Sequence, residues 1–294
     1  MKRFFAKRGN IIRICILVLI LLVSAKGFIN SRSLRLNALK IELKNLPYAF
    51  DGIKVCQITD IHAGPLVSRN LIRDGVDIVM AERPDLVVLT GDFVSGSTKF
   101  LWTSYGGFRQ HHFDYCMEEL GRLNAPLGVF AVLGNHDFWS GQEVALKIIR
   151  GLENIGVQVL RNEAIHLKRN GQSLYLIGVD DYWEESYNLL KALEGVPEDA
   201  CRILLSHNPD VNENIESLNE RIDLIISGHT HGGQVVLPFI GALYLPSPFG
   251  QKYLAGLVRD KERKTYVSRG LGLFFVPVRI NCPADVSLLT LVRE

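Results

Sequence analysis

Short apolar runs recur along most of this chain, and they constrain its fold more than any other feature. Each run is four to seven residues long and rich in Val, Ile or Leu, as are strands buried on both faces; the runs span 53–58, 86–90, 129–133, 174–179, 203–206, 224–227 and 287–292. Between several of them lie segments with helical periodicity, such as 68–81, 115–123 and 141–156. This alternation predicts an α/β fold in which helices cover the sheets.

Polar side chains follow five of these runs, at the points where the predicted strands end. The motifs are Asp60-x-His62, Gly91-Asp92, Gly134-Asn135-His136-Asp137, His207 and Gly228-His229-Thr230-His231, and they contain five of the eight histidines. Ligands of open α/β sheets bind beyond the carboxyl ends of the strands, so we expect these side chains to converge. Each motif alone is compatible with an ordinary turn or an N-cap. The set of five indicates a functional site.

The chemistry of this donor set favours a metal centre. Carboxylate, amide and imidazole ligands without a thiolate suit Mn²⁺, Fe or Zn²⁺ better than Cu(I) or an iron–sulfur cluster. Three or more imidazoles disfavour Mg²⁺, which prefers oxygen ligands. The five cysteines are never in C-x-x-C spacing, which argues against a cysteine-rich zinc module. Two ions about 3.5–4 Å apart can hold a hydroxide and neutralise charge on phosphoryl oxygens, so we expect direct phosphoester hydrolysis by a metal-bound hydroxide.

The order of the motifs over residues 50–292 resembles that of the calcineurin-like metallophosphoesterase superfamily. The resemblance implies a four-layer αββα sandwich with a two-metal site between its sheets. It also implies two ligand groups that share one carboxylate: Asp60, His62 and His231 for one ion, Asn135, His207 and His229 for the other, and Asp92 as the bridge. Mn²⁺ is the first expectation for the two divalent ions, with Fe or Zn²⁺ as alternatives. His136 would act at the leaving oxygen, with Asp137 orienting it.

Further motifs resemble the bacterial membrane-anchored branch of the superfamily: residues 229–234, Pro238, Lys252-Tyr253 and residues 268–272. Some members of that branch are UDP-2,3-diacylglucosamine hydrolases of lipid A synthesis. The resemblance therefore implies a phosphodiester or pyrophosphate substrate, such as a lipid-linked nucleotide of this kind. Ala284 departs from the pattern, because an acidic residue is expected after Pro283. The alternatives are a nuclease, a cyclic-nucleotide phosphodiesterase and a non-catalytic binding scaffold.

Charge is distributed unevenly along the chain. Residues 1–41 contain nine Lys or Arg and no acid, whereas the rest has 24 bases against 31 acids, a net charge of −7. The acidic body argues against a nucleic-acid partner. A basic N-terminus beside apolar sequence suits an anionic membrane surface. The apolar run Ile14–Ala25 indicates an uncleaved anchor in the cell membrane, a secretory signal cleaved after Ala25, or a buried helix.

These features divide the chain into three parts. Residues 1–30 form a basic N-terminus with a hydrophobic helix that serves as anchor or signal, residues 31–50 form a linker and a leading strand, and residues 51–294 form the catalytic domain. Basic charge is denser before the apolar run than just after it, which favours a body outside the membrane. The expected partners are the membrane and a phosphoester substrate.

Two stretches are candidates for selecting the substrate. Residues 96–116 interrupt the α/β rhythm with aromatic and basic side chains, so they either cap the metal centre or form a surface loop. The apolar run 273–278 either lines a passage for lipid or belongs to the core. Cations within or beside these stretches are candidate contacts for a phosphate or headgroup: Arg109, Arg269 and Arg279.

Overall fold

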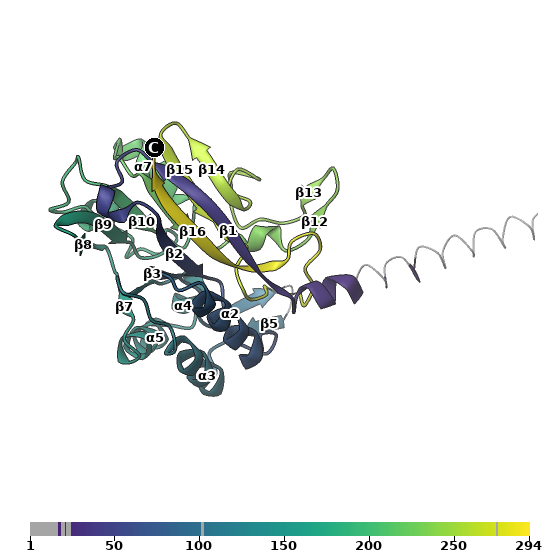
Figure 1. The fold of residues 1–294 in the computed structure, drawn as a ribbon. Coiled ribbons are helices and arrows are strands. Elements are labelled where there is room, and N and C mark those ends of the chain that lie inside the picture. Colours follow the sequence, from purple (N-terminus) through teal and green to yellow (C-terminus); the bar gives the residue numbers. More distant parts are fainter. Residues whose placement is uncertain (1–16, 19–20, 22–24, 101–102, 275) are drawn as a thin grey trace, which may run out of the picture.

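Two six-stranded sheets pack face to face and carry helices on their outer faces (Figure 1). The computed structural model describes residues 17–18, 21, 25–100, 103–274 and 276–294. The first sheet has, in spatial order, β1 (Leu34–Leu43), β16 (Ala284–Arg293), β2 (Ile53–Ile58), β3 (Leu86–Thr90), β6 (Val129–Val132) and β7 (Gln158–Val159). Neighbouring strands are parallel except for β16 and β2, which are antiparallel.

The second sheet has a parallel centre and two antiparallel edges. Its order is β14 (Gly256–Asp260), β15 (Arg263–Val267), β11 (Leu224–Ser227), β10 (Arg202–Leu205), β9 (Gln172–Gly178) and β8 (Glu163–Arg169). The four central strands, from β15 to β9, are parallel to one another. The edge strands β14 and β8 run antiparallel to their neighbours β15 and β9. The carboxyl ends of β10 and β11 therefore open on one edge of this sheet.

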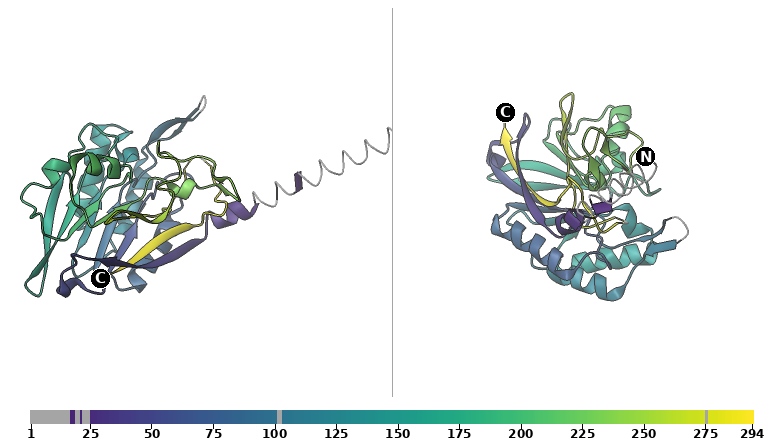
Figure 2. Two further views of the ribbon diagram at one scale, coloured as in Figure 1. Left: turned by 90° about the horizontal axis from the view of Figure 1, so that it is seen from above. Right: turned by 90° about the vertical axis from the view of Figure 1, so that its right-hand side faces the viewer.

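Alternating side chains of the strands build three hydrophobic layers. Val88 of β3 and Ile203 of β10 point into the space between the sheets. Val87 of β3 points instead toward the layer of α2 (Arg69–Ala81), α3 (Gln110–Leu120) and α5 (Gln142–Asn154). Leu204 of β10 packs in the layer with α6 (Leu189–Ala192) and α7 (Val211–Leu218). The α/β prediction is confirmed, and the layers run helix, sheet, sheet, helix (Figure 2).

Shorter elements complete the body. They are η1 (Tyr48–Phe50), β4 (Ser97–Phe100), β5 (Thr103–Gly106), α4 (Asn135–Phe138), η2 (His231–Gly233), β12 (Val236–Leu237) and β13 (Gly241–Ala242). The stretch 96–116 thus contributes the hairpin of β4 and β5 and most of α3. Most of the predicted hydrophobic run Ile14–Ala25 lies outside the described residues. Within the described part, no helix has the length and apolarity to cross a membrane.

β1 lies within residues 31–50, for which a linker and a leading strand are expected, and it forms one edge of the first sheet. It pairs with β16 along its whole length, from Leu34 opposite Ala284 to Leu43 opposite Arg293. Residues 34–43 therefore belong to the same sheet as β2 and β3. The sequence shows only weak alternation here because the apolar positions change phase along the strand. Leu34 and Leu36 pack toward the helix layer, whereas Ile41 and Leu43 point into the space between the sheets.

Candidate metal centre

The loops after β2, β3, β6, β10 and β11 place the seven predicted ligands at one edge of the paired sheets. All seven side chains are buried: Asp60, His62, Asp92, Asn135, His207, His229 and His231. The edge is formed by the carboxyl ends of parallel strands in each sheet. The side chains converge as the strand-end motifs predict.

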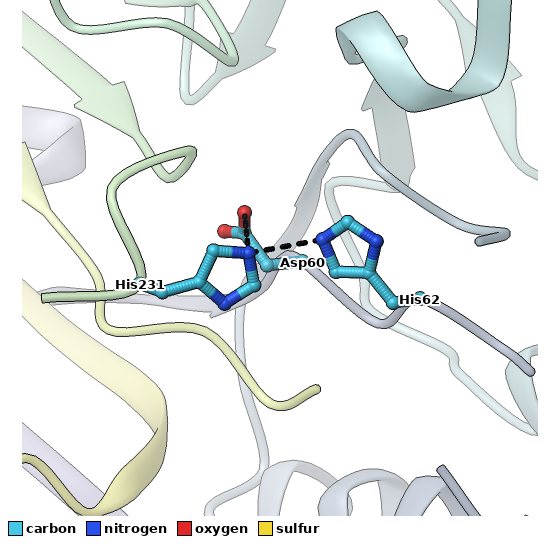
Figure 3. Close-up of side chains that lie close together, drawn as sticks. All are labelled: Asp60, His62 and His231. Carbon is cyan, nitrogen blue, oxygen red and sulfur yellow. Dashed lines mark hydrogen bonds and ion pairs between the residues drawn. The ribbon is translucent and has the colours of Figure 1, made fainter. Parts of the chain in front are cut away.

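The first group of donors consists of Asp60, His62 and His231 (Figure 3). Nε2 of His231 lies 3.4 Å from Oδ1 of Asp60 and 3.0 Å from Nε2 of His62. One donor atom from each residue lies within 4.8 Å of the other two. Three buried donors at this spacing can surround one metal ion.

The second group contains Asn135, His207 and His229, and Asp92 stands between the two groups. Nδ1 of His229 is 3.2 Å from Nε2 of His207 and 3.1 Å from Oδ1 of Asn135. Oδ2 of Asp92 lies 3.3 Å from Nε2 of His207 and also 3.3 Å from Nε2 of His62. One carboxylate oxygen thus faces an imidazole of each group, which is the position that a bridging ligand needs.

Backbone carbonyls fix which nitrogens of two imidazoles face the centre. Nδ1 of His207 lies 2.7 Å from the Thr90 carbonyl and Nε2 of His229 lies 3.0 Å from the Pro246 carbonyl, so each donates its proton there. The other nitrogens, Nε2 of His207 and Nδ1 of His229, then face each other at 3.2 Å. Two lone pairs at that distance repel unless a cation or a proton lies near them. The donors therefore fit a metal ion.

Five of the seven donors have a left-handed backbone, with φ between 47° and 70°: Asp60, His62, Asp92, His229 and His231. Each such residue costs about 1–3 kcal/mol, and strain of this kind persists only where the surroundings enforce it. A neighbouring glycine lets the backbone approach the donors closely. A Cβ at Gly228, for example, would overlap the side chains of Thr59 and Asp60.

Burial and mutual attraction set the protonation of the donors. Burial lowers the pKa of His62 and of His229 to about 3, so both imidazoles are neutral at pH 7. Burial raises the pKa of Asp60 to about 7. Burial also opposes the charges of Asp92 and His207, but their attraction is stronger, so the pKa of Asp92 lies well below its usual range and that of His207 well above. A metal ion would take the place of the His207 proton beside Asp92.

The sequence around this centre matches a known family. The family model described as calcineurin-like phosphoesterase matches residues 53–233, a range that contains every predicted ligand. The chain belongs to the calcineurin-like phosphoesterase family. Membership confirms the resemblance inferred from the motif order. It also confirms the prediction that the protein is a metal-dependent phosphoric ester hydrolase.

Relatives of this calcineurin-like phosphoesterase occur in bacteria and animals. A metallophosphoesterase of Aquifex aeolicus is 33% identical over 92% of this chain and 96% of its own length. The phosphodiesterase YaeI of Escherichia coli is 31% identical over 81% of this chain and 82% of its own length. A metallophosphoesterase of Caenorhabditis elegans is 31% identical over 86% of this chain, which spans about half of that relative, 51% of its length.

His136 of this calcineurin-like phosphoesterase lies beside the metal centre on the one-turn helix α4. Its ring meets the ring of His62 edge-on, with 4.6 Å between centroids, and tilts against Trp139 at 4.4 Å. Its Nδ1 is buried and has no hydrogen-bond partner among the described residues. Burial lowers the pKa of His136, so the ring is neutral at pH 7. His136 also lines the pocket over the centre, where it can meet a substrate.

Asp137 does not have the expected role of orienting His136. Its Oδ1 accepts the amide of Phe93 at 2.9 Å, and its Oδ2 accepts the amides of Asp92 at 2.9 Å and Gly134 at 3.0 Å. The carboxylate therefore joins the loops after β3 and β6 through their backbones. The adjacent positions in sequence suggested a contact with the imidazole, but the turn of α4 directs the two side chains to different partners.

The three predicted substrate arginines differ in their placement. Arg279 is fully buried and donates to backbone carbonyls: those of His231, Arg269, Gly270, Gly272 and Cys282. It holds loops together, so the predicted contact with substrate is wrong for this residue. Nη1 of Arg269 lies 3.1 Å from Oδ2 of Asp285, and its side chain is partly exposed. Arg109 is exposed ahead of α3 and does not line the pocket over the metal centre.

A pocket of about 60 Å³ opens over the metal centre. Besides the donors and His136, it is lined by Trp139, Trp183, Tyr244, Pro246 and Phe274, and other residues. The Trp183 ring stands perpendicular to that of His229, with 4.4 Å between centroids. The sequence did not point to Trp183, Tyr244 and Pro246 as parts of this pocket. The only indication in the sequence is position: Trp183 follows a strand, and Tyr244 and Pro246 follow the Gly228–His231 motif.

Proposed function

We propose that this protein is a dinuclear metal-dependent phosphodiesterase that hydrolyses a phosphodiester or pyrophosphate. The observation that carries the proposal is the position of Asp92 Oδ2, 3.3 Å from an imidazole nitrogen of each donor group. A shared carboxylate oxygen is what two neighbouring cations require. The Escherichia coli relative that is named a phosphodiesterase supports the choice of reaction.

The side chains of the centre have distinct roles in this proposal. Asp60, His62 and His231 hold one ion, while Asn135, His207 and His229 hold the other. Mn²⁺ is the first choice and Fe or Zn²⁺ the alternatives, as the mixed imidazole and carboxylate donors favour. When bound, the ions would activate a water molecule and neutralise charge on the phosphoryl group. As a neutral imidazole in the pocket wall, His136 donates a hydrogen bond to the leaving oxygen.

The proposed location and substrate follow from the N-terminal sequence and the pocket wall. Nine basic residues and the apolar run Ile14–Ala25 favour attachment of the catalytic domain, residues 51–294, to the cell membrane. The apolar aromatic wall suits a substrate with an apolar part. A lipid-linked nucleotide such as UDP-2,3-diacylglucosamine has both a pyrophosphate and acyl chains, and it is the specific substrate that we propose.

The test compares two variants of the full chain with wild type after purification with Mn²⁺. We expect Asp92→Asn to lose bound metal and at least about 10²-fold in the turnover of bis-p-nitrophenyl phosphate, because both ions lose their shared ligand. We expect His136→Ala to lose a similar factor in turnover while it keeps about two metal ions per chain. Metal content is measured by elemental analysis.

Near-normal turnover in His136→Ala would remove this residue from the mechanism. Wild type without stoichiometric metal, or Asp92→Asn with full activity, would contradict the dinuclear centre itself. Far-ultraviolet circular dichroism on each variant separates these results from loss of the fold.

A further inference from the structure

Residues 234–250, which we call the apolar excursion, form a long uncharged segment beside the metal centre. This stretch of 17 residues contains no Asp, Glu, Lys or Arg. β12 and β13 pair within it as a hairpin. Phe239 is fully exposed, and Ile240, Leu243 and Tyr244 are each at least 60% exposed. Single exposed apolar residues are common, but a cluster in one uncharged segment indicates an interaction surface.

The tip of the hairpin presents an aromatic ring at a conformational cost. Phe239 has a φ of 66°, in the left-handed region that a bulky residue rarely adopts. The ring is fully exposed, so packing within the described part of the chain does not repay this cost. Strained residues of this kind concentrate at binding sites. The conformation therefore points to a partner outside the chain.

The apolar excursion adjoins the segment that leads to the N-terminus. The amide of Val236 donates to the Ile280 carbonyl at 3.0 Å, and the amide of Arg279 donates to the Gly27 carbonyl at 3.0 Å. Phe28 and Ile29, on the helix of residues 25–30, are exposed. Figures 1 and 2 show β12, β13 and this helix at the same end of the molecule. One surface thus combines the hairpin with the helix that follows the apolar run.

The chemistry of this surface selects a lipid bilayer as its partner. The apolar run Ile14–Ala25 leads directly into the helix of residues 25–30, so the chain itself brings the surface to any membrane that holds the run. Lys26 and Arg32 are exposed there and can meet anionic headgroups. Apolar and aromatic side chains beside such cations are typical of interfacial membrane anchors.

We propose that the apolar excursion docks onto an anionic lipid bilayer and sets the mouth of the metal pocket at the level of the headgroups. The inference rests on the proposed function and names the partner of that site. Tyr244 and Pro246 of the excursion line the pocket, and the Pro246 carbonyl accepts from His229. Docking would therefore present phosphoesters with an apolar tail to the metal centre directly from the membrane.

A dye that responds to its environment tests the docking without reference to activity. The described cysteines Cys56, Cys116, Cys201 and Cys282 are buried, so in a full chain with Cys15→Ser a dye attached at Ile240→Cys reports on the hairpin. We expect a blue shift and a several-fold rise in emission when the protein is reconstituted into vesicles of phosphatidylglycerol and phosphatidylcholine.

The matched control carries the dye at Tyr48→Cys, which is also exposed. Tyr48 packs on Arg293, and Figure 1 shows the C-terminus at the end away from the hairpin. No shift at Ile240→Cys, or the same shift at both positions, would overturn the docking. A shift that grows with protein concentration without lipid would also overturn it, because a second copy of the chain would then be the partner.

Activity provides a second arm that separates this inference from the proposed function. We expect Phe239→Asp to hydrolyse soluble bis-p-nitrophenyl phosphate within about 2-fold of wild type. With hexadecyl p-nitrophenyl phosphate embedded in the vesicles, we expect a loss of at least about 10-fold. Equal loss or no loss on both substrates overturns the docking. Failure of wild type on both substrates with Mn²⁺ contradicts the proposed function, while the dye still decides the docking.

Discussion

At the scale of single residues, the buried carboxylate of Asp137 has a structural role that its sequence motif does not predict. Its oxygens accept backbone amides from two loops, those of Asp92 and Phe93 and that of Gly134. These loops carry the donors Asp92 and Asn135. Asp137 therefore positions the metal centre through the backbone, and its removal should affect stability before it affects chemistry.

We predict that Asp137→Asn lowers the free energy of unfolding by about 2–3 kcal/mol, because the amide group turns donors toward backbone N–H groups that need an acceptor. Urea unfolding of the purified variant measures the change. Asp181→Asn is the matched control, since Asp181 is also fully buried but accepts a single amide, that of Trp183 at 2.9 Å. Equal losses in the two variants would contradict the role that we assign to Asp137.

The convergence of the candidate donors could be predicted from the sequence, whereas the residues that support them could not. Asp60, Asp92 and His207 directly follow apolar strands, and strand direction alone brings the ends of parallel strands to one edge. The burial of Arg279 depends on the way its own loop folds over the carbonyl of Gly272 and on the carbonyl of His231, 48 residues earlier in the chain. An arginine beside an apolar run has the same sequence pattern whether it contacts a substrate anion or bridges buried carbonyls. Both roles use the guanidinium group, so the sequence does not distinguish them.

At the scale of elements, α2 and α3 are joined by one buried carboxylate. Glu119 of α3 is almost fully buried, and its oxygens accept from Arg69 at 2.6 Å, Arg73 at 3.0 Å and Arg122 at 3.1 Å. The hydrogen bonds from Arg73, then Arg69 and Arg122, lower the pKa of Glu119 from 4.5 to about 2. A depressed pKa stabilises the fold above pH 4.5, and this contribution is lost as the pH falls from 4.5 to 2.

We predict that Glu119→Gln costs about 2 kcal/mol of unfolding free energy at pH 7, because three guanidinium groups lose their shared anion. The difference from wild type should shrink as the pH is lowered from 4.5 toward 2. Urea unfolding at pH 7, 4 and 3 measures it. Glu118→Gln on the same helix is the control, since Glu118 is 64% exposed and should change stability little. A difference that grows on acidification would contradict the prediction.

The central strands were predictable as elements, whereas the edge strands of the second sheet were not. β3, β10 and β11 are continuous apolar runs because both of their faces are covered. β8 and β14 lie at the edges of the second sheet and carry exposed polar residues, so their sequences lack that signal. The β12–β13 hairpin has apolar residues without a core to bury them, and a sequence pattern cannot distinguish that case from a buried strand.

At the scale of the whole molecule, the metal centre draws its donors from both sheets. Asp60, Asp92 and Asn135 follow strands of the first sheet, while His207, His229 and His231 follow strands of the second. Bound ions would therefore join the two sheets. Any ligand that binds the folded state alone stabilises it, by about 2.7 kcal/mol at 100 times its Kd.

We predict that Mn²⁺ raises the thermal midpoint of wild type by about 5 °C or more and that EDTA reverses the shift, because the ions bind only when both sheets are in place. Differential scanning calorimetry of the full chain measures it. Asp92→Asn should show a much smaller shift. An identical shift in that variant would mean that Mn²⁺ stabilises the protein elsewhere.

The position of β16 has a consequence for synthesis on the ribosome. Among the described strands β16 comes last in sequence, yet it lies between β1 and β2, which are translated before the others. Until β16 emerges, the backbone of β2 on that side has no neighbour to pair with, and an open strand edge of this kind promotes aggregation. Polypeptides that stop before residue 284 should therefore bind chaperones or be degraded by proteases, so that little incomplete protein would accumulate in the cell.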